Sequence, residues 1–408
     1  MSPETSAQRP GAWLQATALI AALGALAVVV SAAEGMGMPH RVLAGFSLVP
    51  AVAVAVMAWW WRPMLRTAAT ATLGLLLAAA GTGALTASTG GSMAARPTHV
   101  ALAAAAFAAA CVTALRAGRP TAPEGSLRDH ITLTKPRIMT LLLVTAACAM
   151  VTAARGLPAP GLFAVTMIGL GLSAGGASAL NHVLDRDIDR RMKRTASRPV
   201  ASGRVSPAQA AEFGLALSAA SFVLLASAVN VLTAVLCLAG NLFYVIVYTI
   251  WLKRRTEQNI VIGGAAGAMP PLVGWAAATG SLSVAALLLF VIVFLWTPPH
   301  FWALALLIRR DYERADVPMM PVKGGARRTT NGIVVYTVAL IAATIAIAPA
   351  AGLGWGYLAV AVVSGVVFLV LAAAVWLQPT VPRASRLFRY SLLYLAVVFA
   401  AVAMAAAI

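Results

Sequence analysis

Long apolar segments separated by short polar stretches make up most of the chain, without the strict alternation of polar and apolar positions that marks a β-strand. Many of them run for about 20 residues, the length that an α-helix needs to cross the hydrocarbon core of a bilayer. Because a bilayer admits only helices and closed barrels, this pattern predicts an all-α membrane protein. The predicted transmembrane helices, thirteen in all, cover residues 13–33, 43–61, 67–88, 98–116, 138–154, 161–181, 207–228, 230–251, 260–279, 284–307, 331–350, 355–377 and 388–408.

The distribution of Lys and Arg tests this assignment, because cytoplasmic loops are enriched in these residues. Counted over alternate loops, 27 of the 30 Lys and Arg residues fall on one side of the predicted helices. The other side holds only Arg41, Arg96 and Arg155. A missed or an added helix would scramble this division, so we expect a cytoplasmic N-terminus and a C-terminus outside.

A stretch rich in Pro, Gly and polar residues, AGRPTAPEGSLRDH, interrupts the succession of apolar segments. Four predicted helices precede it and nine follow it. We therefore expect a four-helix bundle in residues 1–116, a linker in 117–130 and a nine-helix domain in 131–408.

Composition supports the membrane assignment, since 61% of the residues are hydrophobic, 10% are charged and the mean hydropathy is +0.87. A net charge of +18 is also common in nucleic-acid-binding proteins, but basic cytoplasmic loops explain it, so we expect no nucleic-acid partner. The cysteines lie inside apolar runs and lack the spacing of metal ligands, which indicates small core residues. They are Cys111, Cys148 and Cys237.

Two short segments, both predicted to be cytoplasmic, hold half of the 12 carboxylates. These are Asp185, Asp187 and Asp189 in the first segment, and Asp311, Glu313 and Asp316 in the second. If the preceding helix continues through the first segment, Asn181, Asp185 and Asp189 share one helical face, and Asp187 lies off it.

Oxygen ligands on one face suit a hard cation such as Mg²⁺, which usually completes its shell with water and substrate phosphates. Nearby basic residues are placed to neutralise a diphosphate. They are Lys193, Arg194, Arg198, Lys253 and Arg254. The alternative is that these acids and bases are solvated charges beside the membrane that pair with one another.

The pattern Asn181-x-x-x-Asp185-x-x-x-Asp189 resembles the first aspartate motif of the intramembrane aromatic prenyltransferase superfamily. Within it, four longer strings resemble the protoheme IX farnesyltransferase (heme O synthase) family. They are LTKPRI (133–138), LKRRTEQNIVIGGAAGAMPPLVGWAAATG (252–280), WTPPHFWALAL (296–306) and DYERADVPMMPV (311–322). The resemblance spans about residues 130–408 and implies nine helices around a membrane-embedded cavity, in the inner membrane of a bacterium.

Two positions depart from the pattern. The second motif of the superfamily is often D-x-x-x-D, whereas position 315 is Ala here, so Asp311 carries over and Asp316 does not. His182 stands where the family commonly has a second Asn.

The resemblance implies farnesyl diphosphate and protoheme IX (heme b) as substrates and heme O, which serves cytochrome oxidase assembly, as product. It implies that Mg²⁺ on Asn181, Asp185, Asp189 and Asp311 grips the diphosphate. The basic residues named above then stabilise the leaving charge. A heme vinyl group captures the allylic cation and water adds.

Four further residues are candidates for substrate binding: Lys135, Arg137, His300 and Tyr312. His300 follows two prolines expected to kink its helix, and it could contact the heme iron or a propionate. A buried His bonded to a freed backbone carbonyl remains an equal alternative. Lys135 and Arg137 could pair with propionates or diphosphate, and plain anchoring at the membrane surface remains open.

The N-terminal part holds His40 and His99, both predicted at the outer ends of helices. Neutral imidazoles at equal depth in a four-helix bundle suit bis-His ligation of heme. The strings H-R-x-x-A, LGLLLAAAGTGALT (73–86) and T-H-x-x-x-A resemble one half of heme A synthase. This resemblance implies a b-type heme site, or a module that docks a separate heme A synthase; a degenerate bundle with two interfacial histidines is the alternative.

Two other function classes were weighed. A membrane prenyltransferase of the quinone or chlorophyll type would need the D-x-x-x-D second motif and would not need W-T-P-P-H-F-W. A transporter, or a heme-binding membrane protein without catalysis, would typically carry ionisable groups in mid-membrane and inverted repeats, whereas the carboxylates here gather at one side.

Overall fold

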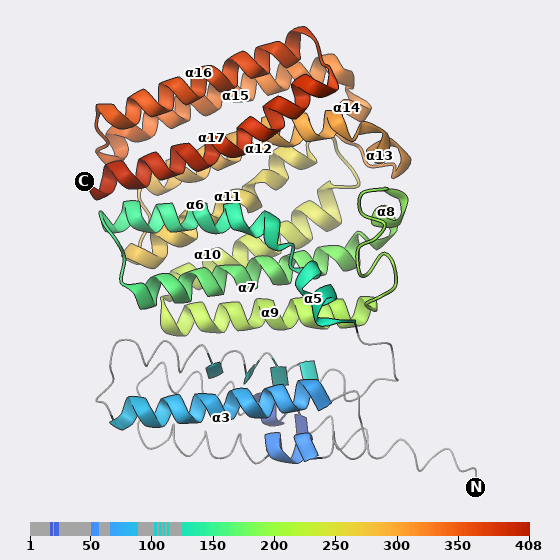
Figure 1. Ribbon diagram of the computed structural model, residues 1–408, viewed down its shortest axis with the longest axis vertical. Coiled ribbons are helices and arrows are strands. Elements are labelled where there is room, and N and C mark those ends of the chain that lie inside the picture. The colour runs from blue at the N-terminus through green and yellow to red at the C-terminus, as the bar shows by residue number, and fades with distance from the viewer. Residues whose placement is uncertain are drawn as a thin grey trace.

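In the computed structural model the described residues are 17–18, 20–23, 50–56, 66–88, 102–103, 106–107, 109–110, 112–113 and 125–408. All the regular structure in these ranges is helical, which confirms the all-α prediction for them. The helices follow one another as antiparallel rods, with α3 (Arg66–Ser88) beneath the C-terminal bundle in Figure 1.

Nine helices in the described part of the chain are long and apolar enough to cross a membrane. They are α6 (Pro136–Ala154), α7 (Pro160–Leu184), α9 (Pro207–Ala228), α10 with η3 (Val231–Leu242 and Phe243–Leu252), α11 (Asn259–Thr279), α12 (Val284–Leu307), α15 (Gly325–Ala351), α16 (Trp355–Leu377) and α17 (Val381–Ala407). This confirms the nine-helix part. Its short helices are α5 (Leu127–Leu133), α8 (Arg186–Arg191), α13 (Arg309–Arg314) and α14 (Met320–Lys323).

The predicted boundaries are wrong by up to two turns at α15 and α17, which begin well before residues 331 and 388. Both helices carry arginines in their first turns, and long basic side chains can extend from a helix end into the aqueous interface. Hydropathy alone therefore placed these helix starts too late. In the N-terminal part, α3 agrees with the predicted helix 67–88, while the other three helices, and hence the total of thirteen, fall largely outside the described residues and stay predictions.

Local sequence signals set several helix ends. Ser206 and Gln209 form a reciprocal capping box at the start of α9, where Pro207 occupies a position that needs no amide hydrogen. Gly280 ends α11 in the left-handed conformation with φ of 68°, which glycine adopts without the steric cost of a Cβ.

Small residues let neighbouring helices approach closely, as is typical of membrane bundles. A Cβ on Gly274 of α11 would lie 2.2 Å from the carbonyl oxygen of Ala146 in α6. Similarly, a Cβ on Gly176 of α7 would lie 2.6 Å from the carbonyl oxygen of Gly214 in α9. These two contacts hold together the helices that carry the polar residues described below.

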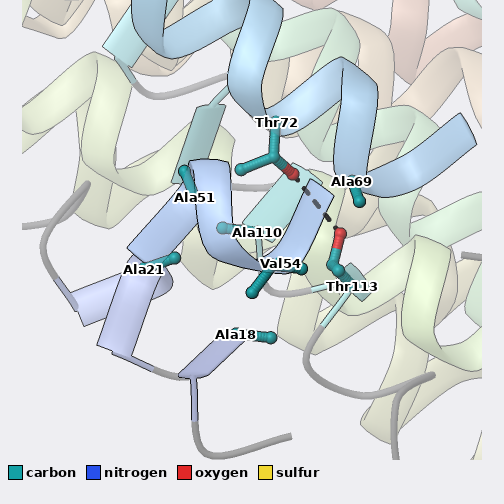
Figure 2. A pocket seen from close by; sticks show the side chains of 8 residues that line it. All are labelled: Ala18, Ala21, Ala51, Val54, Ala69, Thr72, Ala110 and Thr113. Atoms are coloured by element: carbon teal, nitrogen blue, oxygen red, sulfur yellow. Dashed lines mark hydrogen bonds between the residues drawn. The ribbon is translucent and has the colours of Figure 1, made fainter. Parts of the chain in front are cut away.

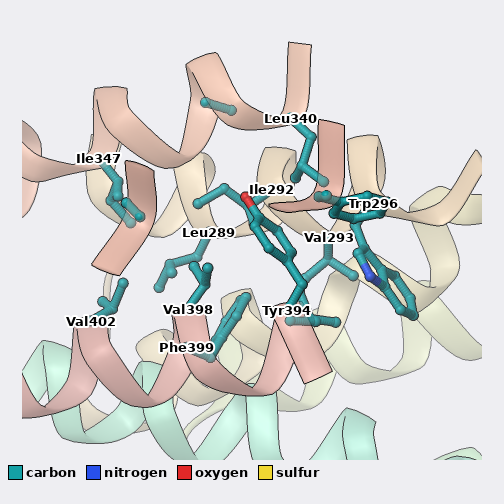
Figure 3. Close-up of a cluster of buried hydrophobic side chains, with 14 of the residues drawn as sticks. Leu289, Ile292, Val293, Trp296, Leu340, Ile347, Tyr394, Val398, Phe399 and Val402 are labelled. Atoms are coloured by element: carbon teal, nitrogen blue, oxygen red, sulfur yellow. The ribbon is translucent and has the colours of Figure 1, made fainter. Parts of the chain in front are cut away.

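Larger apolar side chains fill the space between α12, α15, α16 and α17. Leu289 and Ile292 of α12, Leu340 of α15, and Val398 and Phe399 of α17 are fully buried and interdigitate (Figure 3). This core packs α12 against α15, α16 and α17.

Candidate functional site

The first acidic segment lies where α7 gives way to α8. The helix ends at Leu184, and Asp185 leaves helical geometry with φ of −94° and ψ of 5°. The condition for a fully shared helical face, an unbroken helix through this segment, is therefore not met. The amide of Asp185 nevertheless donates to the carbonyl of Asn181 at 2.9 Å, and that of Asp189 to the carbonyl of Asp185 at 2.8 Å. This spacing keeps the three polar side chains buried, with 2%, 0% and 2% of their surface exposed for Asn181, Asp185 and Asp189.

The two buried carboxylates each face a cation from another segment. Lys253 donates to Oδ2 of Asp185; the carboxylate is buried and 13% of the lysine side chain is exposed. Arg198 donates through Nη1 to both oxygens of Asp189, at 2.8 and 2.9 Å, and is partly exposed. The acids and bases therefore do pair, as one alternative held, but the two carboxylates are buried rather than solvated. A buried charge is costly unless it is paired, so the fold has concentrated charge here at the expense of stability.

The remaining charges of this segment lie nearer the surface. Asp187 and Arg254 form an exposed pair with contacts of 2.6 and 2.7 Å, and the guanidinium holds the pKa of the Asp187 carboxyl well below its usual range. This agrees with the placement of Asp187 off the shared face. Lys193 and Arg194 are exposed. The structure thus brings Arg198 and Lys253 to the buried acids. The other basic residues, Lys193, Arg194 and Arg254, are exposed and form an outer ring.

Lys135 joins this group from the turn that precedes α6. Its backbone is left-handed, with φ of 52° and ψ of 57°, and Pro136 follows it. Its ammonium donates to Oδ1 of Asn181 at 2.7 Å. Burial, together with the positive charges of Arg198 and Lys253, lowers the pKa of Lys135 to about 7. Arg137, two residues further on, is exposed, so the structure separates these two candidates.

A π-helix supplies polar contacts that the sequence analysis did not identify. The hydroxyl of Thr249 accepts from Nδ2 of Asn181 at 3.1 Å and donates to the carbonyl of Tyr244, five residues earlier, at 2.9 Å. The same Nδ2 donates to Oδ2 of Asp185 at 2.7 Å. π-Helical turns are rare and often occur at functional sites. A buried Thr in an otherwise apolar run was the only signal in the sequence.

The second acidic segment, on α13, lies at the same end of the bundle as α8 (Figure 1). One apolar cluster joins Ile188 of α8 to Tyr312 of α13, which is buried. Asp311 has 15% of its side chain exposed, and its nearest cation is Arg314 at 3.8 Å. Asp316 is exposed with φ of 52°. The structure therefore places the two acidic segments beside one apolar cluster at the same end of the bundle and leaves Asp316 at the surface.

Asn259 is a further residue that the sequence analysis missed. It is fully buried at the start of α11, and its Nδ2 donates to the carbonyls of Thr256 and Pro318 at 2.6 and 3.2 Å. These bonds tie the loop that carries Lys253 to the segment that follows Asp311. The string T-E-Q-N was noted in the sequence, but nothing in it distinguished this Asn from a surface residue.

The polar groups around Asp185 supply only part of the ligand shell of a divalent cation. Across the described residues, no three His, Cys, Asp or Glu side chains come together as a complete metal site. Oδ1 of Asp185, however, is buried and has no hydrogen-bond partner among the protein groups described. A buried carboxylate oxygen left unpaired is costly, and it is a good ligand for a hard cation. The residues thus fit Mg²⁺ provided that water and a diphosphate supply the remaining ligands.

His300 lies in α12, which continues as a helix through Pro298 and Pro299. Its ring stacks on Trp296 and Phe388 at 4.3 and 4.7 Å, and Nδ1 lies 2.7 Å from Oγ of Ser391. The expectation of a backbone carbonyl as partner is therefore wrong. Because the Ser391 hydroxyl donates to the carbonyl of Phe388, its oxygen accepts from Nδ1 of His300. In this tautomer the ring proton is on Nδ1, and Nε2 is unprotonated and keeps its lone pair.

His40 and His99 lie outside the described residues. The part of the N-terminal bundle that is described packs through small side chains, with Thr72 and Thr113 bonded at 3.3 Å (Figure 2). The space at its centre is too small for a water molecule. These segments therefore offer tight packing rather than a ligand cavity.

The sequence model of the UbiA prenyltransferase family matches residues 142–407. A protein of Roseiflexus castenholzii named protoheme IX farnesyltransferase is 44% identical over 398 residues, covering 89% of this chain and 74% of that protein. Its counterpart in Symbiobacterium thermophilum is 53% identical over 278 residues, covering 67% and 93%. The chain spans only 54% of the length of the Roseiflexus sp. relative, to which it is 50% identical over 292 residues.

Solved structures share the fold. A digeranylgeranylglyceryl phosphate synthase superposes with a TM-score of 0.59 at 16% identity, covering 69% of this chain and 98% of that one. A UbiA homologue from Archaeoglobus fulgidus, solved with GPP and Mg²⁺, superposes with a TM-score of 0.50 at 15% identity, covering 67% and 99%. At these identities the likeness concerns the arrangement of the helices.

Proposed function

The chain belongs to the UbiA prenyltransferase family, among its protoheme IX farnesyltransferases, and on that basis we propose that it transfers the farnesyl group of farnesyl diphosphate to a vinyl group of protoheme IX. Water adds in the same reaction, and the product is heme O for cytochrome oxidase assembly. The observation that carries the proposal is the buried cluster in which Asp185 and Asp189 face Lys253 and Arg198, with one oxygen of Asp185 unpaired.

Four oxygen-bearing residues are proposed to hold the metal: Asn181, Asp185, Asp189 and Asp311. Mg²⁺, when bound, supplies positive charge that neutralises the diphosphate and favours its departure. Asn181 also has a positioning task, since its amide hydrogen bonds to Asp185 and Thr249 fix the carboxylate while Lys135 occupies its Oδ1. Of the three ligands near α8, Oδ1 of Asp185 is open, whereas Lys135 and Arg198 would have to release Asn181 and Asp189 before these bind the metal.

The cations act on the other side of the head group. Lys135, Lys253 and Arg198 already stand inside the cluster, so a diphosphate would gain their charge without recruiting flexible side chains from solvent. Negative charge builds on the diphosphate oxygens as the allylic bond breaks, and these groups are aimed where it forms. The outer ring is proposed to draw the anion inward and release it, through Lys193, Arg194 and Arg254.

The acceptor is proposed to sit between the cluster and α12. The Nε2 lone pair of His300 supports contact with the heme iron, since ligating histidines usually donate their other N–H to an oriented acceptor, as Nδ1 does to Ser391. Tyr312 is proposed to line the binding site and Arg137 to meet a propionate at its rim. The vinyl carbon attacks the allylic cation, and a water oxygen then bonds to the carbon left electron-poor as one proton leaves.

Apolar surroundings protect the allylic cation from early hydrolysis. In the described bundle, the apolar cluster of α8, α11, α12 and α13 lies directly beside the charged residues. The charged end is proposed to face the cytoplasm and the C-terminus the outside of a bacterial inner membrane, as the Lys and Arg distribution predicts.

The N-terminal bundle is proposed to bind heme b through His40 and His99, or to dock a heme A synthase. The match to the Roseiflexus castenholzii protein covers 89% of the chain, more than residues 131–408 alone can account for, so the sequence similarity extends into residues before 131. An optical spectrum of the full chain purified from heme-replete cells tests the first form. A low-spin signal that His40→Ala and His99→Ala each remove is expected; its absence from the wild type contradicts heme ligation.

The activity is tested on membranes that contain the chain, supplied with farnesyl diphosphate, Mg²⁺ and protoheme IX, with products identified by mass spectrometry. A heme that has gained one farnesyl group and one hydroxyl group is expected. A prenylated quinone precursor or chlorophyllide in parallel reactions, with no modified heme, would assign the chain to another acceptor. Bound but unmodified heme would indicate a binding protein.

A further inference from the structure

His182 is the buried titratable residue that the proposed mechanism leaves unused. It lies in the last turn of α7, with 1% of its surface exposed. Neither ring nitrogen has a hydrogen-bond partner among the protein groups described. The other two histidines of the described region are both engaged, His300 with Ser391 at 2.7 Å and His130 with the carbonyl of Ser126 at 2.9 Å. His182 therefore stands apart as an imidazole buried with unmet hydrogen-bonding capacity.

The helix face that carries His182 points toward the turn before α6. Residues 175, 178 and 182 lie on one face of α7 by their spacing. The hydroxyl of Ser178 donates to the carbonyl of Leu133 at 2.6 Å, and a Cβ on Gly175 would lie 3.1 Å from the side chain of Thr134. Lys135 is the next residue of that turn. This face of α7 therefore packs against the turn that carries Lys135, whose ammonium donates to Asn181, the neighbour of His182 in the chain.

Three cations lie near enough to His182 to act on its ring: Lys135, Arg198 and Lys253. They are the same cations that contact Asn181, Asp189 and Asp185, so the neighbouring carboxylates are already paired. A buried N–H without an acceptor is unfavourable, and such groups in native structures call for an explanation such as a ligand. A ligand that can lie among three cations and accept a hydrogen bond is an anion with oxygen acceptors.

We propose that His182 donates a ring N–H to an oxygen of the bound diphosphate, and so belongs to the head-group site as a fourth kind of contact beside the carboxylates, the amide and the cations. This inference rests on the proposed function, because it takes the diphosphate of the prenyl donor as the anion. The imidazole is a neutral donor, so it contributes direction rather than charge, and it orients the head group relative to Asp185.

The test compares His182→Leu with His182→Asn in the full-length protein purified in detergent. Leucine fills a similar volume without polar atoms, whereas asparagine keeps an N–H donor at the same position. The probe is inorganic diphosphate with Mg²⁺, and its affinity is measured by calorimetry and by the rise in melting temperature. Ser178→Ala, one turn earlier on the same face, is the matched control for disturbance of the helix.

His182→Leu is expected to melt at a higher temperature than the wild type without ligand, because it removes an unpaired buried polar group. It is expected to bind diphosphate about tenfold more weakly, as a lost hydrogen bond to a charged partner requires. The KM for farnesyl diphosphate rises by the same factor while the KM for heme stays unchanged. His182→Asn keeps the affinity within about threefold, and Ser178→Ala lowers the melting temperature without changing the affinity.

Unchanged diphosphate affinity in His182→Leu would overturn the inference, and so would an equal loss of affinity in His182→Asn. Both results can occur in a protein whose wild type transfers farnesyl normally, so the proposed function would stand. If His182→Leu does not fold, His182→Asn together with His182→Gln decides, since both must retain binding. A wild type that binds no diphosphate would instead contradict the proposed function itself.

Discussion

The two oxygens of the Asp185 carboxylate have different surroundings. Oδ2 accepts from both Asn181 and Lys253, while Oδ1 is buried without a protein partner. An arrangement that satisfies only one oxygen of a buried charge does not serve stability, because the unpaired atom keeps its desolvation cost. Its chemical use is to leave one ligand position open at a defined place, held in position by two neighbours.

The first prediction concerns that charge. Asp185→Asn keeps the shape of the side chain and removes its negative charge, so we expect the rate of farnesyl transfer to fall by at least about a hundredfold. The measurement is heme O formation by membranes adjusted to equal amounts of folded protein. Asp187→Asn is the matched control, because Asp187 is exposed and pairs with Arg254 outside the buried cluster, and its rate should stay within about threefold. Equal effects of the two substitutions would contradict the site.

The second prediction concerns the orientation of His300. Ser391→Ala removes the acceptor for Nδ1, so the ring loses the bond that fixes its tautomer. We expect the KM for heme to rise about tenfold, with the KM for farnesyl diphosphate unchanged. Steady-state kinetics with each substrate varied in turn measures both. A rise in the KM for farnesyl diphosphate alone would place His300 on the donor side instead.

At the scale of elements, interruptions in helices position the site. The helix breaks at Asp185, between α7 and α8, so the acidic segment changes direction there. The π-helix after α10 places Thr249 within hydrogen-bonding distance of Asn181. Neither interruption follows from hydropathy, which treats residues 161–181 and 230–251 as uniform apolar runs. Both interruptions are stabilised by contacts with side chains from distant segments of the chain.

The third prediction concerns the contact between α6 and α11. Gly274→Ala places a methyl group 2.2 Å from the carbonyl oxygen of Ala146, and backbone at that distance cannot yield cheaply, so we expect a loss of about 1–3 kcal/mol of stability. Gly267→Ala in the same helix meets nothing within 4 Å and should be neutral or slightly stabilising. Thermal unfolding in detergent compares the pair. Similar melting temperatures for both variants would mean that α6 and α11 do not approach this closely.

At the scale of the whole molecule, the two acidic segments come from parts of the chain more than a hundred residues apart and meet through one apolar cluster at one end of the bundle. Asn259 reinforces this by bonding to Pro318, which follows the second segment. The charged end and the apolar body are therefore distinct regions of one fold.

The fourth prediction concerns the metal. Because no three described carboxylate or imidazole groups form a complete metal site, we expect Mg²⁺ to bind weakly to the ligand-free chain and tightly only with diphosphate present. Calorimetric titration of Mg²⁺ with and without inorganic diphosphate checks this. Chelation should abolish transfer and added Mg²⁺ should restore it. Tight Mg²⁺ binding without diphosphate would mean that the protein ligands alone suffice.

The sequence by itself determined the helical class, the nine-helix part and the identity of most polar residues of the site. The length of the apolar segments and the uneven distribution of Lys and Arg determine how a chain crosses a bilayer, and both can be counted in the sequence. Asn181, Asp185 and Asp189 can be recognised by their spacing of four residues. Even so, the sequence also offered Lys193, Arg194 and Arg137 on equal terms with Arg198, Lys253 and Lys135.

Only the tertiary structure separated those groups, because which cation reaches a buried carboxylate depends on how segments far apart in the chain pack. It also supplied Thr249 and Asn259, and it left Oδ1 of Asp185 and the ring of His182 without protein partners. The type of a residue determines which hydrogen bonds its side chain can form. Which of these hydrogen bonds actually form in the protein depends on the segments that pack around that side chain.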